Sequence, residues 1–370
     1  MERLAVFYGG KSCEHEVSII TALSIIAEIE SDYEIIPVYM CEKGFFTGEL
    51  LKNIDSYKSF DENMHVKIIL DGNSLKTRGF LGFMKEYDRF DVALICAHGG
   101  MGEGGGLSGL LEINNVPYTC CDVLSSSVCL DKEYFKIIAK HKGFKVVSGT
   151  CITKNDVKSP KTLERIIKKY GELLVVKPVD CGSSVGVKAI NGLDELKKSV
   201  DVAFAYSDRV IIEKRITQMV EYNCAAICVG GEIIVSAIEK PRAHGDILSY
   251  KDKYLQKEKI KPEYKPESLS YTLSNKIRKT TYKLYEEFNL SGVVRVDYIY
   301  NEKDNELYVN EVNTVPGSLS TGLFKECGIE TKVLVDALIE DARRKFEKKN
   351  NLITHYSSEL LSGEYKVNKN

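Results

Sequence analysis

The sequence predicts an α/β protein of several lobes that begins with an open sheet. Residues 4–8 form an apolar strand, residues 17–29 form an apolar helix, and a second strand follows at residues 33–39. Residues 90–97 are a continuous apolar run, which is typical of a buried parallel strand. Because strand and helix alternate here, we expect a sheet whose loops form a binding crevice beyond the strand ends.

Length, charge and cysteine content narrow the possible classes of function. A chain of 370 residues exceeds the usual size of one core, so two or three lobes are expected. The net charge of −2, with both signs interspersed, disfavours nucleic acid and anionic membranes as partners. No apolar run reaches the roughly 18 residues of a membrane span, and the N-terminus lacks the layout of a signal peptide. The 11 cysteines contain no Cys-x-x-Cys pair, which indicates reduced thiols in a cytoplasmic protein.

The second half of the chain continues with short strands and amphipathic helices. The expected strands lie at 173–178, 210–214, 221–229 and 232–238, and the expected helices at 131–143, 193–203 and 273–288. Residues 241–266 are polar and rich in lysine and tyrosine, and their length indicates a functional loop.

A predicted hairpin carries a candidate metal site. Residues two apart in a strand share a face, so Arg295 lies beside Asp297, and Glu311 lies beside Asn313. The polar residues 301–305 have the composition of the turn between the two strands. If the two faces coincide, two carboxylates and a carboxamide oxygen form a ligand set that suits Mg²⁺. The alternative is a solvated hairpin with a surface ion pair.

A turn rich in glycine and serine follows the strand at 173–178. Glycines within residues 182–186 let backbone N–H groups approach phosphate oxygens, and the hydroxyls of Ser183 and Ser184 add donors. Lys177, at the end of the preceding strand, could reach the same phosphates. The loop joins strand to strand and lacks the Gly-x-x-x-x-Gly-Lys-Ser/Thr pattern, so a plain hairpin turn is the alternative.

Three further features allow both a functional and a purely structural explanation. A second glycine-rich loop at residues 98–109 contains Glu103, and its backbone must approach either a ligand or a neighbouring helix. Glu213 and Lys214 end an apolar strand, as residues that meet an adenine would, and as many surface strands do. Glu16 stands at a helix start, where a carboxylate either caps the helix dipole or binds an ammonium group.

Taken together, these segments resemble the D-alanine–D-alanine ligases of the ATP-grasp superfamily. The resemblance extends from about residue 4 to about residue 345 and rests on eight short landmarks in sequence order. The landmarks are Gly9-Gly10 with Glu14-His15-Glu16-Val17-Ser18, His98-Gly99 with Gly102-Glu103, Leu130-Asp131-Lys132, Val176-Lys177-Pro178 with Gly182-Ser183-Ser184-Val185-Gly186, Ile212-Glu213-Lys214, Lys253-Tyr254, Arg295-Val296-Asp297, and Asn310-Glu311-Val312-Asn313-Thr314-Val315-Pro316-Gly317.

The resemblance implies an ATP-grasp fold of three α/β lobes, of which the first is Rossmann-like. The expected bounds are 1–130 for an N-terminal substrate-binding lobe, 131–212 for a central lobe with the phosphate loop, 213–350 for a C-terminal lobe with a lid loop and the metal site, and 351–370 for a tail. The implied activity is ATP-dependent ligation of two D-alanines through an acyl phosphate, for peptidoglycan precursors and thus cell-wall shape. A cytoplasmic homodimer is expected, with small-molecule substrates and neither nucleic acid nor membrane as partner.

The resemblance also implies roles for particular residues. Those implied in holding the first amino acid and the oxyanion are Glu16, Ser183, Tyr254, Arg295 and Gly317. Those implied in other substrate contacts are His98, Ser318 and Ser320. Those implied in ATP binding are Lys132, Lys177, Ser184, Val185, Glu213, Lys214, Ile216, Glu221 and Lys253. Two Mg²⁺ ions, or Mn²⁺ in their place, would be bound by Asp297, Glu311 and Asn313.

The sequence departs from the family pattern near the second substrate. Gly104 replaces an Asp and Ser108 a Gln in the second glycine-rich loop, and Gly322 replaces a Ser that helps hold the second substrate's carboxylate. Tyr254, by resemblance, favours an amine over a hydroxy acid as the second substrate. Two alternatives therefore remain: a ligase with another second substrate (D-Ser, D-lactate or another amino acid), and a nucleotide-binding homologue without turnover.

Overall fold

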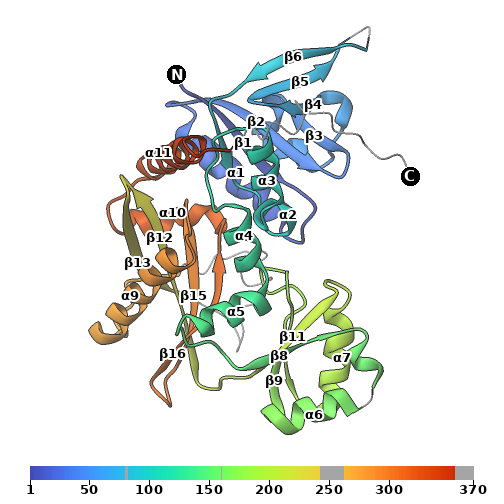
Figure 1. The fold of residues 1–370 in the computed structure, drawn as a ribbon, viewed down its shortest axis with the longest axis vertical. Coiled ribbons are helices and arrows are strands. Elements are labelled where there is room, and N and C mark those ends of the chain that lie inside the picture. Colours follow the sequence, from blue (N-terminus) through green and yellow to red (C-terminus); the bar gives the residue numbers. More distant parts are fainter. Residues whose placement is uncertain (80–81, 160, 242–261, 355–370) are drawn as a thin grey trace, which may run out of the picture.

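Three sheets along the chain define the architecture (Figure 1). The computed structural model describes residues 1–370 except 80–81, 160, 242–261 and 355–370. Most of the predicted loop at 241–266 lies outside the described residues, and with it Lys253 and Tyr254.

The N-terminal sheet has seven strands. They are Arg3–Gly9 (β1), Glu34–Cys41 (β2), Gly44–Thr47 (β3), Val66–Asp71 (β4), Ser74–Arg78 (β5), Met84–Arg89 (β6) and Val92–Ile95 (β7), in the order β6-β5-β4-β3-β2-β1-β7. β1 pairs in parallel with β2 and with β7, as the alternation of strand and helix predicted. β2 to β6 pair antiparallel as successive neighbours, an extension that the sequence did not predict because β6 is almost wholly exposed.

Helices follow the parallel strands of this lobe. They are α1 (His15–Ile29), which joins β1 to β2, and then α2 (Gly100–Glu103), α3 (Gly106–Ile113), α4 (Val123–Leu130) and α5 (Lys132–His141) after β7. Three short 3-10 helices, η1 (Glu49–Lys52), η2 (Ile54–Tyr57) and η3 (Glu62–Met64), lie between β3 and β4.

The central sheet is antiparallel and has four strands. They are Gly149–Thr153 (β8), Leu173–Pro178 (β9), Lys188–Asn191 (β10) and Arg209–Lys214 (β11), in the order β10-β9-β11-β8. The 3-10 helix η4 (Asp156–Lys158) and the helices α6 (Lys161–Tyr170) and α7 (Leu193–Ala203) complete this lobe, which encloses its own apolar core (Figure 1). The glycine–serine turn joins β9 to β10, as predicted.

The third sheet is antiparallel and has five strands. They are Met219–Val229 (β12), Glu232–Lys240 (β13), Glu263–Tyr264 (β14), Val294–Asn301 (β15) and Glu306–Asn313 (β16), in the order β14-β13-β12-β15-β16. The helix α9 (Tyr271–Glu287) packs on one face of the sheet (Figure 1). The 3-10 helix η5 (Gly317–Ser320), α10 (Thr321–Lys325) and α11 (Thr331–Asn350) follow β16.

Two helices pack outside the lobes in which the sequence placed them. Phe135 of α5 belongs to the core of the five-stranded sheet, although 131 was the expected start of the central lobe. Leu334 and Leu338 of α11 join the core of the N-terminal sheet. The four-stranded sheet, in turn, continues to Lys214, past the expected boundary at 212. α5 thus packs against the C-terminal lobe and α11 against the N-terminal sheet, while the central lobe keeps a separate core.

Candidate functional site

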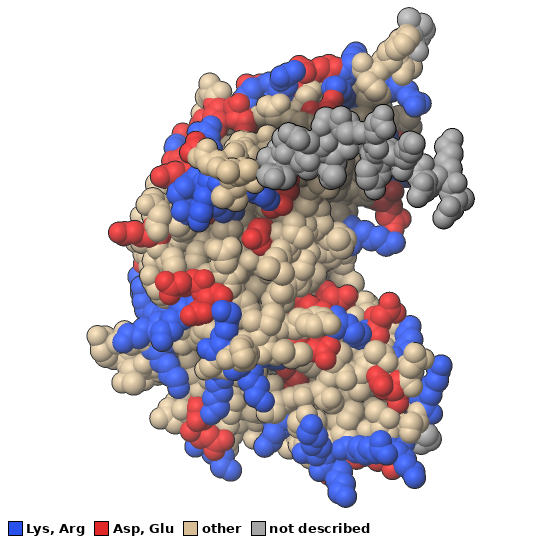
Figure 2. All heavy atoms as spheres, viewed as in Figure 1, with Lys and Arg blue, Asp and Glu red and all other residues tan. Residues whose placement is uncertain are grey.

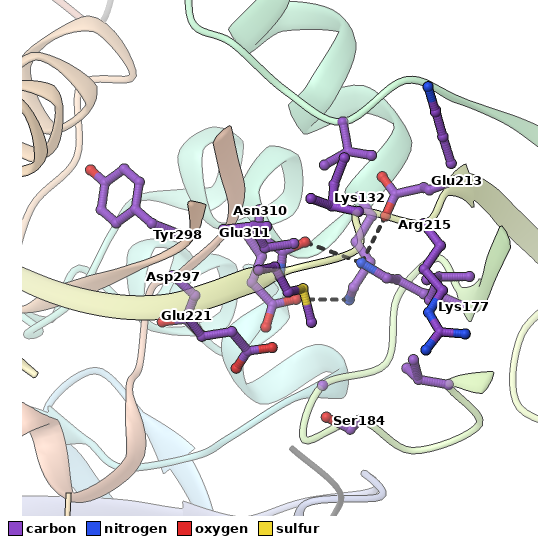
Figure 3. Close-up of a pocket in the computed structure, with 18 of the residues that line it drawn as sticks. Lys132, Lys177, Ser184, Glu213, Arg215, Glu221, Asp297, Tyr298, Asn310 and Glu311 are labelled. Atoms are coloured by element: carbon purple, nitrogen blue, oxygen red, sulfur yellow. Dashed lines mark hydrogen bonds and ion pairs between the residues drawn. The ribbon is translucent and has the colours of Figure 1, made fainter. Parts of the chain in front are cut away.

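One pocket gathers most of the residues that the sequence analysis assigned to ATP and metal. It lies between the four-stranded sheet and the strands β15 and β16 (Figure 3), and Figure 2 shows a hollow in the surface beside the lobe that carries α6 and α7. The predicted residues in its lining are Lys132, Lys177, Ser184, Glu213, Lys214, Ile216, Glu221, Asp297 and Glu311. Lining side chains that were given no role include Arg215, Met219, Asn223, Tyr298 and Asn310.

Glu213 anchors a buried cluster of charges at one end of this pocket. Its carboxylate is 1% exposed; one oxygen lies 2.7 Å from Lys177 Nζ, and the other is in ion-pair contact with Lys136 without the geometry of a hydrogen bond. Burial alone would raise the pKa of Glu213, but the two ammonium groups outweigh it and lower this pKa to about 2. Both carboxylate oxygens of Glu213 thus already contact lysines, and the contact of this side chain with adenine stays a prediction.

Lys132 and Lys177 point from different elements toward the same space (Figure 3). Lys177 Nζ donates to Asn310 Oδ1 at 3.1 Å, and Lys132 Nζ lies 3.6 Å from Glu311 Oε2. Lys132 Nζ also donates to the carbonyl oxygen of Cys181 at 2.6 Å, which links α5 to the start of the glycine–serine turn. Two largely shielded ammonium groups at one end of the pocket, on side chains that are 8% and 12% exposed, suit the phosphates of a nucleotide.

The hairpin β15–β16 places its four predicted residues on one face. Asp297 and Glu311 are cross-strand partners, as are Arg295 and Asn313. The Arg295 guanidinium donates to both oxygens of Asp297, at 2.6 and 2.9 Å, and Asn313 Nδ2 donates to Asp297 at 3.2 Å. The convergence that the alternation predicted is present, so the solvated-hairpin alternative does not apply.

The donor chemistry of this face fits a hard divalent cation. Asp297 and Glu311 supply carboxylate oxygens and Asn313 an amide oxygen, which are the ligands that Mg²⁺ takes beside phosphates. Within the described residues no three His, Cys, Asp or Glu side chains are grouped closely enough to hold a metal by themselves. The set therefore fits an ion whose shell is completed by a substrate.

The glycine–serine turn is held against the N-terminal lobe by Glu14. The Ser183 hydroxyl donates to Glu14 Oε1, and a Cβ built on Gly182 would lie 2.8 Å from the Glu14 carboxyl carbon. Ser183 and Ser184 have φ of 50° and 60°, in the left-handed region. Glu14 is buried, whereas Glu16 is exposed on the outer side of α1. The prediction that Glu16 shares a network with Ser183 is thus wrong by two residues, and Glu14 is the residue in that place.

Glu103 and His98 tie the second glycine-rich loop to the segment after β16. The Glu103 carboxylate accepts from the backbone N–H groups of Gly99, Thr314 and Val315 at 2.9, 3.0 and 3.3 Å. Burial raises the pKa of Glu103, and the nearby Glu14 carboxylate acts in the same direction. His98 Nδ1 lies 2.6 Å from the Val315 carbonyl oxygen, to which it donates, so Nε2 accepts from the Thr21 hydroxyl at 2.9 Å. Both ring nitrogens of His98 are engaged within the protein.

His98 is expected to make the stability of the protein depend on pH. Burial lowers the pKa of its ring to about 4, and the charge of Arg295 acts in the same direction. In the unfolded chain the ring titrates near its ordinary pKa of about 6.5. The contribution of neutral His98 is therefore complete above about pH 6.5 and is lost as the pH falls toward 4, by about 3 kcal/mol in the free energy of unfolding.

The variant His98→Gln isolates this effect, because glutamine keeps one donor and one acceptor without titrating. Urea denaturation across the same pH range should show the parent losing more stability on acidification than the variant does, by about 3 kcal/mol. His141→Gln, on the exposed end of α5, is the control and should follow the parent. Equal pH slopes for the parent and His98→Gln would contradict the assignment.

The turn after β16 is tightly constrained. Ser318, Leu319 and Ser320 all have φ near 50°, a conformation that is unfavourable for non-glycine residues and concentrates at functional sites. The Ser318 N–H donates to Thr21 Oγ1 at 3.1 Å, while the Ser318 side chain is exposed. The Ser320 hydroxyl is buried and has no partner among the described residues. A Cβ built on Gly317 would meet open space, so a ligand can approach that backbone closely.

One of the residues predicted to bind ATP, Val185, does not line the pocket. Val185 lies in the glycine–serine turn, where its N–H donates to the Gly182 carbonyl at 3.1 Å, and it is outside the pocket lining.

Lys136 was missed by the sequence analysis, although it stands one helical turn after Lys132 and so shares its face of α5. The spacing i, i+4 was the available signal.

Comparison with known proteins assigns both halves of the chain to one protein family. Residues 3–121 match the family model described as the D-ala D-ala ligase N-terminus, and residues 138–340 match the one described as the D-ala D-ala ligase C-terminus. The D-alanine–D-alanine ligase of Thermosipho africanus is 33% identical over 100% of both chains. That of Caldicellulosiruptor bescii is 30% identical over 96% of this chain and 99% of its own.

Solved structures give the same result. The D-alanine–D-alanine ligase from Coxiella burnetii superposes with a TM-score of 0.80 at 26% identity, over 95% of this chain and 98% of the other. The D-Ala:D-Ser ligase VanG from Enterococcus faecalis gives a TM-score of 0.75 at 25% identity, over 92% and 99%. Among the helices that the structure describes, none has both the length and the apolar character to cross a membrane.

Proposed function

The chain belongs to the D-alanine–D-alanine ligase family, and from this premise we propose that it joins two D-alanines into D-alanyl-D-alanine while ATP becomes ADP and phosphate. The observation that carries the proposal is the pocket of the ATP-grasp fold in which buried lysines face the carboxylates of β15 and β16. The product would serve as a peptidoglycan precursor in the biogenesis of the cell wall.

The reaction has two steps with balanced bonds. The carboxylate of the first D-alanine attacks the γ-phosphorus of ATP, so that an acyl phosphate forms and ADP leaves. The amine of the second D-alanine then attacks the acyl carbon, loses a proton and expels phosphate. In both steps the protein mainly positions the reactants and neutralises charge.

Glu14 and Ser183 would hold the first D-alanine. Glu14 is a buried carboxylate at the junction of the N-terminal lobe and the glycine–serine turn, and an ammonium group there gains a charged hydrogen bond. Tyr254 is proposed as the third member of this group from the resemblance alone. His98 is proposed to support the site indirectly, because its nitrogens are engaged by Val315 and Thr21.

Charge on the reacting groups would be neutralised from two sides. Lys132 and Lys177 would bind the phosphates of ATP, with Ser184 and Val185 of the turn closing on them and Lys253 added by resemblance. Arg295 and the Gly317 N–H would donate to the oxyanion of the tetrahedral intermediate. Support comes from the position of Arg295 beside Asp297 and from the open space at Gly317.

Nucleoside binding is proposed at the exit of β11. The backbone from Lys214 to Ile216 would meet the adenine, and Glu221 the ribose, since all three line the pocket. Glu213 is proposed to contact the adenine by resemblance alone, while its carboxylate also holds Lys136 and Lys177.

Asp297, Glu311 and Asn313 are proposed as ligands of Mg²⁺, with two ions as the number and Mn²⁺ as an alternative. The bound cation would neutralise charge on the transferred phosphoryl group. Arg295 and Lys132 lie against the two carboxylates, at 2.6 Å from Asp297 and 3.6 Å from Glu311.

The wider organisation is proposed as follows. Residues 1–130, 131–212 and 213–350 form the three lobes, with α5 packed on the C-terminal lobe and α11 on the N-terminal sheet, and 351–370 form a tail. We propose a homodimer on the resemblance alone, to be checked by light scattering. A cytoplasmic location is supported by the use of ATP and by 11 free cysteines.

Phosphate release with D-alanine and ATP, with products identified by mass spectrometry, tests the proposed function. Formation of D-alanyl-D-alanine from D-alanine alone is the expected result. The second candidate, a D-alanine–D-serine ligase, is favoured by the similarity to VanG and by the departures at Gly104, Ser108 and Gly322. A product with only D-serine at the second position would select this second candidate. A product with D-lactate there, or ADP formation without any ligated product, would exclude both candidates.

The proposed role of Glu14 predicts a sharp difference between two nearby carboxylates. Glu14→Gln should raise the KM for the first D-alanine by about tenfold to a hundredfold, because a charged hydrogen bond is replaced by a neutral one. Glu16→Gln, two residues away and exposed, should leave this KM unchanged. Steady-state kinetics with ATP saturating measure both. A larger effect at Glu16 than at Glu14 would restore the original assignment.

A further inference from the structure

Tyr264 is packed against the one helical glycine of α10. A Cβ built on Gly322 would overlap the Tyr264 hydroxyl oxygen and lie 3.2 Å from the ring carbon Cζ. The backbone at Gly322 is not in the left-handed region, so its conformation does not demand glycine. Glycine is needed at this position because the phenol occupies the space of a side chain.

The register of the five-stranded sheet puts Tyr264 on the face of the metal residues. Cross-strand partners share a face, and the pairs Glu239–Tyr264, Asn223–Glu239, Asp297–Asn223 and Asp297–Glu311 form one row across the sheet. Strands lie about 4.8 Å apart, so Tyr264 stands about 14 Å from Asp297 along this row. That span leaves room for an amino acid beside the phosphoryl group.

Tyr264 offers a hydrogen-bond donor that none of the described residues uses. Its hydroxyl makes no hydrogen bond to any residue that the structure describes. Burial raises the pKa of Tyr264, and the carboxylates of Glu239 and Glu326 act in the same direction, so the phenol stays protonated. These carboxylates are themselves engaged: Asn223 donates to Glu239 at 2.8 Å, and Lys265 lies 3.4 Å from Glu326.

A second unused hydroxyl lies close by in the chain. The buried Ser320 side chain, two residues before Gly322, has no partner in the described part of the protein. The second amino acid reacts through its amine and keeps its carboxylate, which needs donors in the site. Arg295, Lys132 and Lys177 are proposed above for the oxyanion and the phosphates, and the two hydroxyls are donors of the described residues that have no such role.

We propose that the Tyr264 hydroxyl, admitted by the absence of a side chain at Gly322, donates to the carboxylate of the second amino acid and so determines the specificity of that site. This inference rests on the proposed ligase function. Ser320 is the second donor to the same carboxylate. The chemical class recognised is an α-amino acid with a free carboxylate, so an amide in its place is bound less well.

Tyr264→Phe removes only the hydroxyl and tests the proposal in the full-length enzyme. The KM for the second D-alanine should rise by about tenfold or more, while the KM for ATP stays unchanged. The preference of the parent for D-alanine over D-alaninamide as second substrate should narrow by a similar factor. Tyr282→Phe, an exposed tyrosine on α9, is the matched control and should behave as the parent.

A rescue experiment separates loss of the hydroxyl from loss of packing. Tyr264→Ala empties the space beside Gly322, so Gly322→Ser added to it can return a hydroxyl there and should recover part of the lost affinity. Gly322→Ser in the parent should impair the second site, because it displaces the phenol. A KM for the second substrate within about twofold of the parent in Tyr264→Phe would overturn the proposal.

The parent enzyme distinguishes failure of this inference from failure of the proposed function. If the parent forms D-alanyl-D-alanine and Tyr264→Phe does so equally well, only the role of Tyr264 is overturned. If the parent uses D-serine instead, the second substrate of the proposed function is overturned, and the same KM comparison with D-serine decides the role of Tyr264. If the parent enzyme ligates no pair of substrates, both the proposed function and the role of Tyr264 are overturned.

Discussion

Glu311→Gln is expected to reduce ATP-dependent ligation by about a thousandfold, through loss of several kcal/mol of transition-state charge stabilisation. Glutamine keeps the shape of the side chain but removes the charge that a cation opposite Asp297 requires. The fold should be retained, because Glu311 is partly exposed and its ion pair with Lys132 is loose at 3.6 Å.

The measurement is phosphate release at increasing Mg²⁺ concentration, together with thermal unfolding. The variant should need far more Mg²⁺ for any turnover, with an unfolding temperature close to that of the parent. Glu306→Gln, at the start of the same strand and paired with Lys145 at the surface, is the control and should keep normal kinetics. Normal Mg²⁺ dependence in Glu311→Gln would remove this residue from the metal site.

The hairpin illustrates what sequence alone predicts well. Two alternating strands with a polar turn determine which side chains share a face. The metal hypothesis required only that its ligands lie on the same face of the hairpin. Arg295, Asp297 and Asn313 accordingly lie within hydrogen-bonding distance of one another. The period of two along each strand was enough to predict this arrangement, without knowledge of any contact between distant parts of the chain. The predicted ATP-grasp fold is likewise confirmed by the family and the solved relatives.

Glu14 shows where local reasoning was applied to the wrong residue. The buried positions of α1 include Ser18, Ala22 and Ile25, while Glu16 and Ile20 lie on the exposed side. No local signal in the sequence indicated this, because Ile20, at i+4 from Glu16, is apolar and yet lies exposed in the structure. The contact of Glu14 with Gly182, moreover, joins two lobes, and no pattern within either segment predicts it.

Glu213 shows a different limit of sequence reasoning. Its place at the end of β11 was predicted, but its partners come from α5 and β9, far away in the chain. An acidic residue at a strand end has the same local appearance whether it meets a ligand or a buried lysine. The distinction depends on tertiary packing and on the cost of burying charge, which local patterns do not contain.

Glu213→Gln is expected to destabilise the protein by about 3–5 kcal/mol, because it removes the carboxylate that is in ion-pair contact with two largely buried ammonium groups. The cluster holds one carboxylate and two lysines, and both Lys136 and Glu213 are buried. Lys136→Met should be much milder, because the pair of Glu213 and Lys177 remains and is neutral. The two substitutions therefore differ strongly although they break the same ion pair.

Nucleotide binding should reduce the difference in stability between Glu213→Gln and Lys136→Met, by stabilising Glu213→Gln. The phosphates of ADP would neutralise the ammonium groups of Lys136 and Lys177 that Glu213→Gln leaves unneutralised. ADP should therefore raise the free energy of unfolding of this variant more than that of the parent. Urea denaturation with and without ADP measures both effects. Equal destabilisation by Glu213→Gln and Lys136→Met would contradict a charge cluster with excess positive charge. An equal response of both variants to ADP would contradict the assignment of that excess charge to phosphate binding.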